Sequence, residues 1–352
     1  MQYAHKNYTV ESVTEGHPDK ICDQISDAIL DECLKQDPAS RVAVECFGGH
    51  GMLFISGEIT ASCEVDFAKI ASDVYCGIGY EDNLKIITNV VKQSLDISQG
   101  VDTGGAGDQG IMYGYASDET VEYLPLGVVV SHKLARGLEN LRKSGKISWL
   151  RPDGKAQITI EDEKIKNILV STQHKDEISQ TEIEKELVEK LIRPIIGDDF
   201  EKIEILVNPT GRFVSGGFEA DTGLTGRKIM VDTYGGLIPH GGGSFSGKDA
   251  TKVDRSAAYM ARFVAKNLVA NKLAKKCLVS VAYAIGRAEP VMLEAVNEKG
   301  EDLSGFVKKY FDFKPRAIIE RLKLQSPIFS KTSTYGHFGK KHLPWEEVIL
   351  IG

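Results

Sequence analysis

Residues 240–249 read HGGGSFSGKD, and the kind of fold to expect depends on whether this stretch is a Walker loop. The run from Gly242 to Asp249 fits the phosphate-binding pattern G-x-x-x-x-G-K-[ST] at every position except the last, where Asp249 replaces the hydroxyl residue that holds magnesium. A Walker loop follows its strand directly, but here further glycine clusters separate the loop from the strand expected at 228–233. The stretch therefore favours a non-Walker fold, with Asp249 as N-cap of a helix that starts near residue 250. The alternative is a glycine-rich turn without a ligand.

Three segments with the apolar spacing of a helix divide the chain into comparable parts. Their apolar residues recur at i, i+3 or i+4, and i+7, which is the period of an amphipathic helix. Each is followed by two strand-like segments and a further helix. The first helices start near 19, 126 and 250; the strand-like segments are 41–47, 52–60, 156–161, 165–172, 278–285 and 290–296; the later helices are a run from 65, then 181–192, 303–310 and 316–322.

This recurrence predicts an α+β fold of three structurally similar domains, because repeats of more than 100 residues are copies of a domain rather than units of a solenoid. Each domain is expected to hold a mostly antiparallel sheet with helices on one face. The uncovered faces of the three sheets are then expected to meet at the centre and bury one another.

Composition and charge exclude several classes of protein. Apolar residues make up 42% and charged residues 26%, as in globular proteins. The net charge of −7 leaves no broad basic surface for nucleic acid, and no apolar run is long enough to span a membrane. The first ten residues do not resemble a secretory signal, so we expect a cytoplasmic protein whose six cysteines are reduced. Neither the cysteines nor the eight histidines have the spacing of a zinc site.

Basic residues gather in glycine-rich segments, which indicates a local site for an anion. The segments NPTGRF (208–213) and DTGLTGRK (221–228) place Arg212, Arg227 and Lys228 beside glycines in an otherwise acidic protein. Guanidinium and ammonium groups on such loops are suited to phosphate oxygens. A solvated charge pair is the alternative interpretation of the same residues.

The segment GHPDK (16–20) has both a structural and a chemical interpretation. Pro18 and Asp19 are ordinary residues for a helix start. His17 could instead donate a hydrogen bond to a phosphate, and Asp19 could bind a hard cation. With no Ser-His-Asp set and no kinase motif in the chain, the residues alone indicate a magnesium–nucleotide enzyme of non-Walker type.

Other polar positions carry little signal when taken singly. Asp108 in GAGDQG (105–110) is expected to shape a turn, and Lys155 follows an Asp-Gly pair typical of a hairpin turn. Glu45 and Glu58 lie on predicted strands and are expected to face solvent.

These motifs together resemble the S-adenosylmethionine synthetase (methionine adenosyltransferase) family of the bacterial and eukaryotic type. GHPDK, GAGDQG and HGGGSFSGKD occur in register with NPTGRF, LTGRK, VDTYGG and VDRSAAYMAR, and the resemblance covers 12–345. It implies three α+β domains around a pseudo-threefold axis, and homodimers with shared active sites that commonly pair into tetramers. It also implies synthesis of S-adenosylmethionine from ATP and L-methionine by sulfur attack on C5′ of ATP, with release of triphosphate that is hydrolysed to pyrophosphate and phosphate.

The resemblance implies a role for each matching residue. The expected catalytic residues are His17, Lys155, Arg227 and Lys248. The expected ATP-binding residues are His17, Asp153, Lys155, Arg212, Phe213, Asp221, Arg227, Lys228, Ser244 and Lys248. The expected methionine-binding residues are Glu58, Gln93, Asp108, Asp221 and Lys252. Two Mg²⁺ ions per site are expected at Asp19 and Asp254, and one K⁺ ion at Glu45.

With this resemblance, the chain divides into an N-terminal domain (1–97), a mobile gating loop (98–110), a central domain (111–221) and a C-terminal domain (222–352), between which segments can be exchanged. The loop 94–110 is shorter than is usual in the family, and Leu95 stands where a proline is common. These departures bear on lid closure and turnover rate rather than on the reaction class.

Two other functions fit part of the pattern. One is a magnesium-dependent kinase or triphosphatase that never uses methionine; the other is a catalytically silent homologue, against which the full set of charged residues argues. The spacing also raises a conflict, because Asp254 lies six residues after Lys248 and thus about 120° around a helix from it. One phosphate could hardly face both from a single chain, and a site shared between two chains would remove the conflict.

Overall fold

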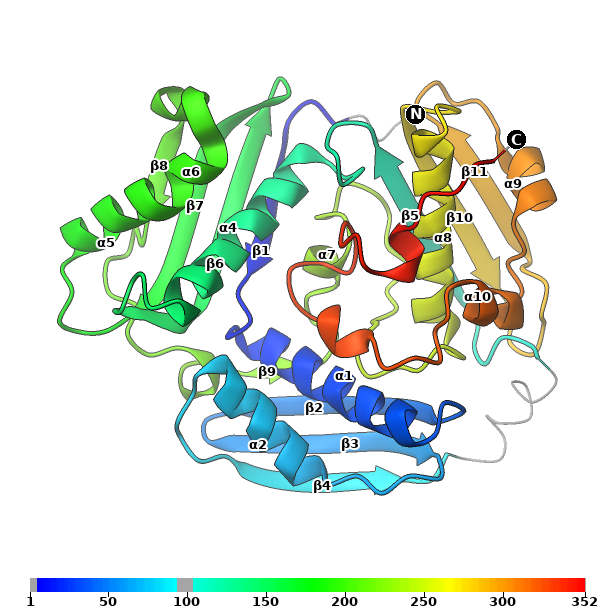
Figure 1. Ribbon diagram of the computed structural model, residues 1–352, viewed down its shortest axis with the longest axis horizontal. Coiled ribbons are helices and arrows are strands. Elements are labelled where there is room, and N and C mark those ends of the chain that lie inside the picture. Colours follow the sequence, from blue (N-terminus) through cyan, green and yellow to red (C-terminus); the bar gives the residue numbers. More distant parts are fainter. Residues whose placement is uncertain (1–4, 94–103, 352) are drawn as a thin grey trace.

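The fold is described here from a computed structural model, which describes residues 5–93 and 104–351. Three sheets surround a centre of helices (Figure 1). The strands are β1 Tyr8–Val13, β2 Arg41–Gly49, β3 Met52–Thr60, β4 Lys85–Val91, β5 Gly110–Ser117, β6 Leu150–Glu161, β7 Lys164–His174, β8 Glu204–Val207, β9 Gly223–Leu224, β10 Lys276–Tyr283 and β11 Met292–Asn297. The helices are α1 Pro18–Gln36, α2 Phe67–Ile78, α4 Leu126–Lys143, α5 Gln180–Leu187, α6 Arg193–Ile196, α7 Ile229–Asp232, α8 Val253–Ala270, α9 Ser304–Tyr310 and α10 Pro315–Arg321.

The predicted α+β fold of three similar domains is confirmed, and the repeated unit is visible in each sheet. Helices α1, α4 and α8 each precede an antiparallel strand pair, which is β2–β3, β6–β7 or β10–β11. Two sheets are mixed, because β4 lies parallel to β3 and β8 lies parallel to β7.

Each sheet also contains a strand from another part of the chain. Strand β1 precedes α1 but pairs with β6, β5 precedes α4 but pairs with β10, and β9 precedes α8 but pairs with β2. The strand before each long helix therefore completes the sheet of the next unit, in a cyclic exchange. Each exchanged strand thus lies in one of the predicted domains (1–97, 111–221 and 222–352) and pairs with a strand of another. The domain boundaries stay a proposal. Within the expected gating loop, residues 98–103 lie outside the described residues.

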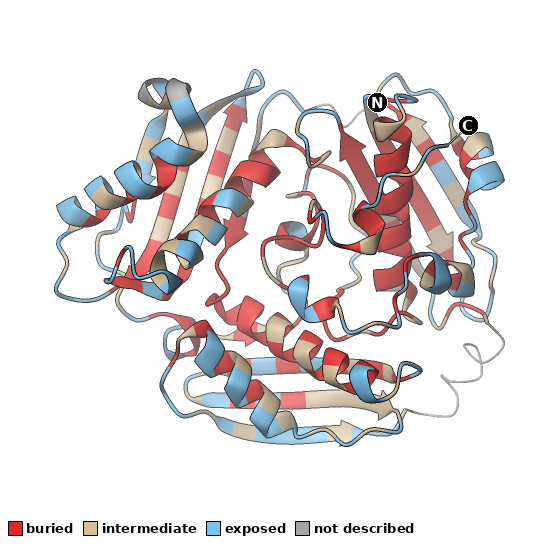
Figure 2. Cartoon of the chain, viewed as in Figure 1, coloured by how far each residue is buried: buried red, intermediate tan, exposed pale blue. Residues whose placement is uncertain are grey.

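The centre is filled by helices, so the expectation that uncovered sheet faces meet there was wrong. Every residue of α8 from Arg255 to Val269 is buried, and the C-terminal segment 323–346 passes between α1 and α8 (Figure 1). The uncovered face of the β2–β4 sheet points outward instead, with Phe47 49% and Phe54 37% exposed (Figure 2). The spacing of apolar residues in the sequence predicted one apolar face on each long helix. It did not predict that polar residues on the opposite face are buried too.

Ion pairs make this burial of polar helix faces possible. Arg255 of α8 donates from both terminal nitrogens to the two carboxylate oxygens of Asp27 in α1, at 2.7 and 2.9 Å. About two and three turns further along α8, Arg262 and Lys266 both bond to the buried Glu346, at 2.9 and 2.8 Å. Buried charges are tolerated only when they are paired, and these pairs tie α8 to α1 and to the C-terminal segment.

Three local predictions were wrong. Residues 228–233 form the helical turn α7 rather than a strand, and the side chain of Asp232 in that turn pairs with the buried Lys20. Asp153 and Gly154 do not form a hairpin turn but lie within β6, where the register with β7 is irregular. The third long helix begins at Val253 rather than near residue 250.

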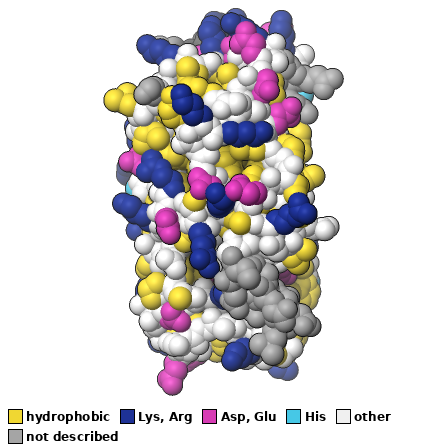
Figure 3. Space-filling view, turned by 90° about the vertical axis from the view of Figure 1, so that its right-hand side faces the viewer, with side chains coloured by type: hydrophobic (Ala, Val, Ile, Leu, Met, Phe, Trp, Pro, Cys, Tyr) yellow, Lys and Arg dark blue, Asp and Glu magenta, His cyan; other side chains and the backbone are white. Residues whose placement is uncertain are grey.

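Three of the expectations from composition can be compared with the structure. All six cysteines are free. Across 5–93 and 104–351, no helix has both the length and the apolar character needed to cross a membrane. On the face beside the sheet of β5, β10 and β11, basic, acidic and hydrophobic side chains are interspersed rather than gathered into one basic surface (Figure 3).

Candidate active site

Two groups of charged residues lie along one edge of β2. Residues 247–249 run beside the start of the strand, where the nitrogen of Asp249 donates to the carbonyl of Val42 at 3.0 Å. Strand β9 runs beside its end, where Leu224 pairs with Phe47. Ala43, which bridges to Lys248, precedes Phe47 by four residues. A strand rises about 3.3 Å per residue, so the two groups lie about 13 Å apart along the strand.

The first cluster forms at the start of α1. His17 is the N-cap, and its Nδ1 accepts a hydrogen bond from the backbone nitrogen of Asp19 at 3.2 Å. Asp19 in turn accepts from the backbone nitrogen of Leu224 at 3.0 Å and from Nζ of Lys228 at 2.6 Å. Nε of Arg227 lies 3.4 Å from the same carboxylate. The motif GHPDK is therefore both a helix start and the seat of a cationic cluster.

Electrostatics fixes the protonation state of this cluster. Burial, together with the positive charge of Lys228, lowers the pKa of His17 to about 3, so its imidazole is neutral at pH 7. Because Nδ1 accepts from Asp19, the ring carries its hydrogen on Nε2, which is left as a neutral donor. Burial alone would raise the pKa of Asp19, but the hydrogen bonds from Lys228 and Leu224 lower it below the ordinary value.

Strand β6 adds further groups to the first cluster. Asp153 is buried, and its Oδ2 accepts from the backbone nitrogen of Gly217 at 2.9 Å, while its Oδ1 has no partner among the described residues. Burial raises the pKa of Asp153 to about 6. Lys155 is exposed, yet close enough that its charge helps to lower the pKa of His17. Asp221 is exposed and close enough to raise the pKa of Asp153.

The loop 208–216 places its two predicted ATP-binding residues differently. Phe213 is half-buried beside His174, whose Nε2 accepts from the Phe213 backbone nitrogen at 3.0 Å. Arg212 instead pairs with Asp176 at 3.1 Å, and both of these side chains are mostly exposed. The structure therefore does not bring the guanidinium of Arg212 to the first cluster.

The second cluster centres on an ion pair between Lys248 and Asp254. Nζ of Lys248 lies 2.7 Å from Oδ2 of Asp254. The conflict inferred from helical geometry was wrong, because α8 begins only at Val253 and residues 248–252 are not helical. Lys252, in the same non-helical segment, pairs with Asp249.

Asp249, at the position that departs from the Walker pattern, has a structural role. Its Oδ2 accepts from the backbone nitrogen of Val42 at 2.7 Å, and its Oδ1 accepts from that of Thr251 at 2.8 Å. It is not the N-cap of α8, because that position belongs to Lys252, which makes no side-chain cap. Asp249 thus fastens the glycine-rich segment to the edge of β2.

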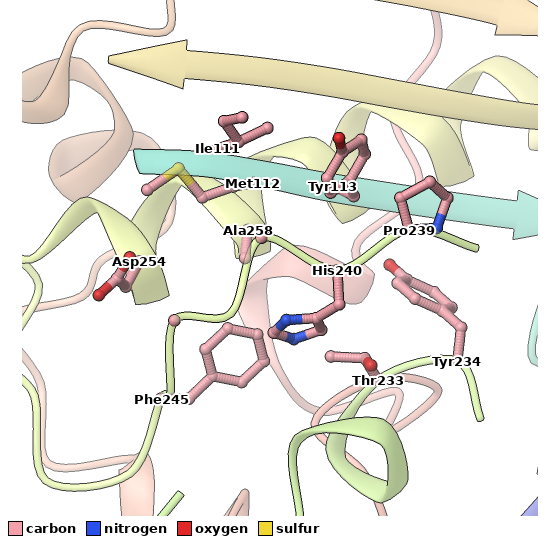
Figure 4. A pocket seen from close by; sticks show the side chains of 12 residues that line it. Ile111, Met112, Tyr113, Thr233, Tyr234, Pro239, His240, Phe245, Asp254 and Ala258 are labelled. Atoms are coloured by element: carbon pink, nitrogen blue, oxygen red, sulfur yellow. The ribbon is translucent and has the colours of Figure 1, made fainter. Parts of the chain in front are cut away.

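The glycine-rich segment also passes close to the backbone beside the first cluster. A β-carbon added to Gly226, next to Arg227, would lie 2.4 Å from Cβ of Ser244. On the other side of the segment, Asp254, Met112, His240 and Phe245 border a small hollow under β5 (Figure 4).

Replacing Gly243 with alanine is expected to lower activity about 100-fold. Its β-carbon would lie 2.3 Å from Oδ1 of Asp254, so the carboxylate must turn away from Lys248. Steady-state kinetics would measure this loss. Gly305→Ala, where an added β-carbon meets nothing within 4 Å, is the control and should keep full activity. Wild-type kinetics in Gly243→Ala would show that the position of Asp254 does not matter.

Four predicted residues lie apart from both clusters or at their margin. Glu45 and Glu58 occupy the outward face of the β2–β4 sheet, because they lie two residues before the exposed Phe47 and four residues after the exposed Phe54. Gln93 follows β4, and its amide oxygen is buried without a partner among the described residues. Asp108 is exposed and bonds to the backbone of Gln109. Within one chain these side chains do not meet the first cluster.

The carboxylates fit a magnesium ion that arrives with its substrate. Among the described residues, no three histidine, cysteine or carboxylate side chains gather as a metal site. Asp19 and Asp254 each stand beside a lysine, however, and magnesium is usually held by one or two carboxylates together with water and substrate phosphates. The set fits Mg²⁺ bound between protein and polyphosphate, rather than Mg²⁺ held by the protein alone.

Two histidines of this region were not predicted from the sequence. His174 ends β7 and contacts the backbone of Phe213, and His240 begins the glycine-rich segment, where its Nδ1 accepts from Gly242 at 2.9 Å. His240 stood within the quoted motif and could have been found there. His174 carries no motif, so only the structure reveals it.

Comparisons with known proteins cover nearly the whole chain. Models of the N-terminal, central and C-terminal domains of S-adenosylmethionine synthetase match residues 5–99, 103–213 and 215–347. A curated S-adenosylmethionine synthase of Mesoplasma florum is 52% identical, covering 98% of each chain. Another, from Clostridium tetani, is 48% identical over 97% of each chain.

Proposed function

Because the chain belongs to the S-adenosylmethionine synthetase family, it is a methionine adenosyltransferase that makes S-adenosylmethionine from ATP and L-methionine, and we propose that it does so by direct attack of the methionine sulfur on C5′ of ATP. A sulfur lone pair forms the new bond while the C5′–O bond breaks, and its electron pair leaves with the triphosphate. The thioether has no proton to lose, so no general base is needed. The triphosphate is then hydrolysed to pyrophosphate and phosphate.

The observation that supports this mechanism best is the convergence of cations without a poised base. Lys228 and Arg227 surround Asp19 in the first cluster, and Lys248 belongs to the second. Such groups stabilise charge that develops on the leaving oxygens. The neutral Nε2–H of His17 is suited to donate a hydrogen bond to the oxygen that bridges C5′ and the phosphate.

Enzymes of this family use metal ions, and we propose two Mg²⁺ ions per site, at Asp19 and Asp254, and one K⁺ at Glu45. When bound, Mg²⁺ neutralises charge on the triphosphate. In the structure, Lys228 forms an ion pair with Asp19, and Lys248 forms one with Asp254. If Mg²⁺ bound these carboxylates instead, each ammonium group would be placed to contact a phosphate oxygen.

Oxygen labelling would separate this mechanism from that of a kinase or triphosphatase. ATP labelled with ¹⁸O in the C5′–O bridge is incubated with methionine, Mg²⁺ and K⁺, and the products are weighed by mass spectrometry. Attack on C5′ sends the label into the phosphate products and leaves a sulfonium product free of it. Label retained on an adenosine product would show attack at phosphorus and refute the proposal.

We further propose a homodimer in which each site takes its first cluster from one chain and its second from the partner. The outward face of the β2–β4 sheet exposes a row of large apolar side chains, which a second copy would cover. Glu45 and Glu58 lie on that same face, so covering it would place them in an interface. The exposed side chains are Phe47, Met52, Phe54, Ile87 and Val91. The family resemblance further implies that such dimers pair into tetramers.

Mixing two inactive variants would test the shared site. Lys155→Ala damages the first cluster and Lys248→Ala the second, so a mixed dimer has one site with both defects and one with neither. Coexpression is expected to restore about a quarter of wild-type activity, because half of the dimers are mixed and half of their sites are intact. Coexpressed Lys155→Ala and Lys228→Ala, both in the first cluster, should stay inactive. A site within one chain would leave both mixtures inactive.

A further inference from the structure

We propose that His174 is a positioning residue that holds Phe213 in place for the adenine ring and thereby sets the affinity and base selectivity for ATP. The proposal rests on the function proposed above and on the family resemblance, which implies that Phe213 binds ATP beside the adenine. His174 is only 4% exposed and has not been assigned a role by any motif of the sequence.

Two hydrogen bonds join His174 to Phe213. The backbone nitrogen of His174 donates to the carbonyl of Phe213 at 2.9 Å, and the backbone nitrogen of Phe213 donates to Nε2 of His174 at 3.0 Å. In an ordinary antiparallel pair the second acceptor would be the backbone carbonyl. Here the imidazole takes that place, so the ring itself determines where the chain turns at Phe213.

The tautomer of the ring follows from its other contact. Nδ1 of His174 lies 2.7 Å from the carbonyl oxygen of Lys175, which can only accept. Nδ1 therefore carries the hydrogen, and Nε2 is a bare acceptor for the Phe213 backbone. Both ring nitrogens are occupied, so His174 cannot also exchange a proton with a substrate, and its role is to position the loop.

Neighbouring residues hold the same loop at further points. The side chain of Asn208 exchanges hydrogen bonds with the backbone of Thr172, at 2.8 and 3.0 Å. The amide of Gln173 donates to the carbonyl of Val214 at 2.9 Å and accepts from the backbone nitrogen of Asp153 at 3.2 Å. The last three residues of β7 thus tie loop 208–214 to the first cluster.

Among these contacts, the hydrogen bond to the His174 ring has the largest effect on the position of Phe213, because Phe213 is only half-buried. A half-buried side chain has fewer packing contacts, so its position depends more on the hydrogen bonds of its backbone. Loss of the imidazole would remove one of the two bonds that hold the backbone of Phe213, while leaving the bonds of Asn208 and Gln173 intact. The expected defect is therefore in recognition of the base rather than in folding or in phosphate binding.

Three substitutions separate the acceptor from the bulk of the side chain. His174→Leu keeps an apolar body without an acceptor. His174→Asn places a polar group at Nδ1 but cannot reach the Phe213 backbone, and it replaces the leucine variant if that variant fails to fold. His174→Gln extends an oxygen to the position of Nε2 and is the conservative control.

The measurement is the steady-state kinetics of each variant with ATP and with GTP. We expect His174→Leu and His174→Asn to raise KM for ATP about tenfold, as for loss of one buried hydrogen bond, with KM for methionine unchanged and kcat changed less than about threefold. The ratio of kcat/KM for ATP to that for GTP should fall, and His174→Gln should restore most of both quantities.

Other outcomes would overturn the proposal. A KM for ATP and an ATP/GTP ratio within twofold of wild type, in a folded leucine or asparagine variant, would show that the ring does not position Phe213. Equal losses with both substrates, together with a lower thermal midpoint, would show a general structural role. If the wild type made no sulfonium product, the proposed function would fail, and the affinity of the same variants for a non-hydrolysable ATP analogue, by calorimetry, would still decide the role of His174.

Discussion

Replacing Lys248 with alanine is expected to lower kcat about 100- to 1,000-fold, the range measured when one preorganised group that stabilises developing charge is removed. Nζ of Lys248 lies 2.7 Å from Asp254, and the side chain is 20% exposed, so it is ordered but reachable by a ligand. In the proposed reaction this ammonium faces the departing triphosphate. Its loss therefore removes an interaction that strengthens as the C5′–O bond breaks.

Stability should change little in the same variant, because a partly exposed ion pair contributes at most about 1 kcal/mol. Lys276→Ala is the matched control, since Lys276 has one carboxylate partner at 2.8 Å and 24% exposure but lies outside both clusters. Kinetics and urea unfolding of both variants check the prediction. Near-wild-type turnover in Lys248→Ala would remove Lys248 from the cationic site.

Replacing Arg255 with methionine is expected to cost about 3 to 5 kcal/mol of unfolding free energy, because the buried carboxylate of Asp27 would then lack its partner. Arg255 is fully buried and bonds to Asp27 at 2.7 and 2.9 Å and to Thr332 at 3.0 Å. It also donates to the backbone carbonyl of Lys248 at 3.1 Å, so its loss reaches the second cluster.

A double variant identifies the cause of that loss. Asp27→Leu combined with Arg255→Met removes both charges, and it should recover a large part of the stability that Arg255→Met loses. Lys69→Ala, at an exposed pair with Asp73, should change stability by less than about 0.5 kcal/mol. Urea unfolding at pH 7 measures all of these. An Arg255→Met protein as stable as wild type would show that this central pair does not hold the helices together.

Much of the fold could be predicted from the sequence because its elements follow from local patterns. The spacing of apolar residues predicted the first residues of α1 and α4 to within one residue, and Pro18 marked the start of α1. Strand β3 was predicted to the residue. Boundaries failed where a side chain had a distant partner, as at Asp249, which bonds to β2 rather than capping α8.

Other features could not be predicted because they depend on contacts between distant segments. The exchange of β1, β5 and β9 leaves no mark in the strands themselves, since a strand pattern does not specify its neighbour. Ile229 and Val231 resembled a strand, but the buried pair of Asp232 with Lys20 lies in a helical turn. The residue types of the clusters were visible in the motifs, whereas the contact between Lys248 and Asp254 required the late start of α8.

The strand exchange has a consequence for synthesis on the ribosome. Thr9 of β1 and its partner Thr159 of β6 are 150 residues apart, so β1 emerges long before the strand that it pairs with. At about 5 to 20 residues per second, β1 has no partner for roughly 8 to 30 s. During that time the nascent chain presents an unpaired edge to other polypeptides. Protection by chaperones and slow translation at low temperature therefore matter more for the folding of this protein than the finished structure, with its exchanged strands, would suggest.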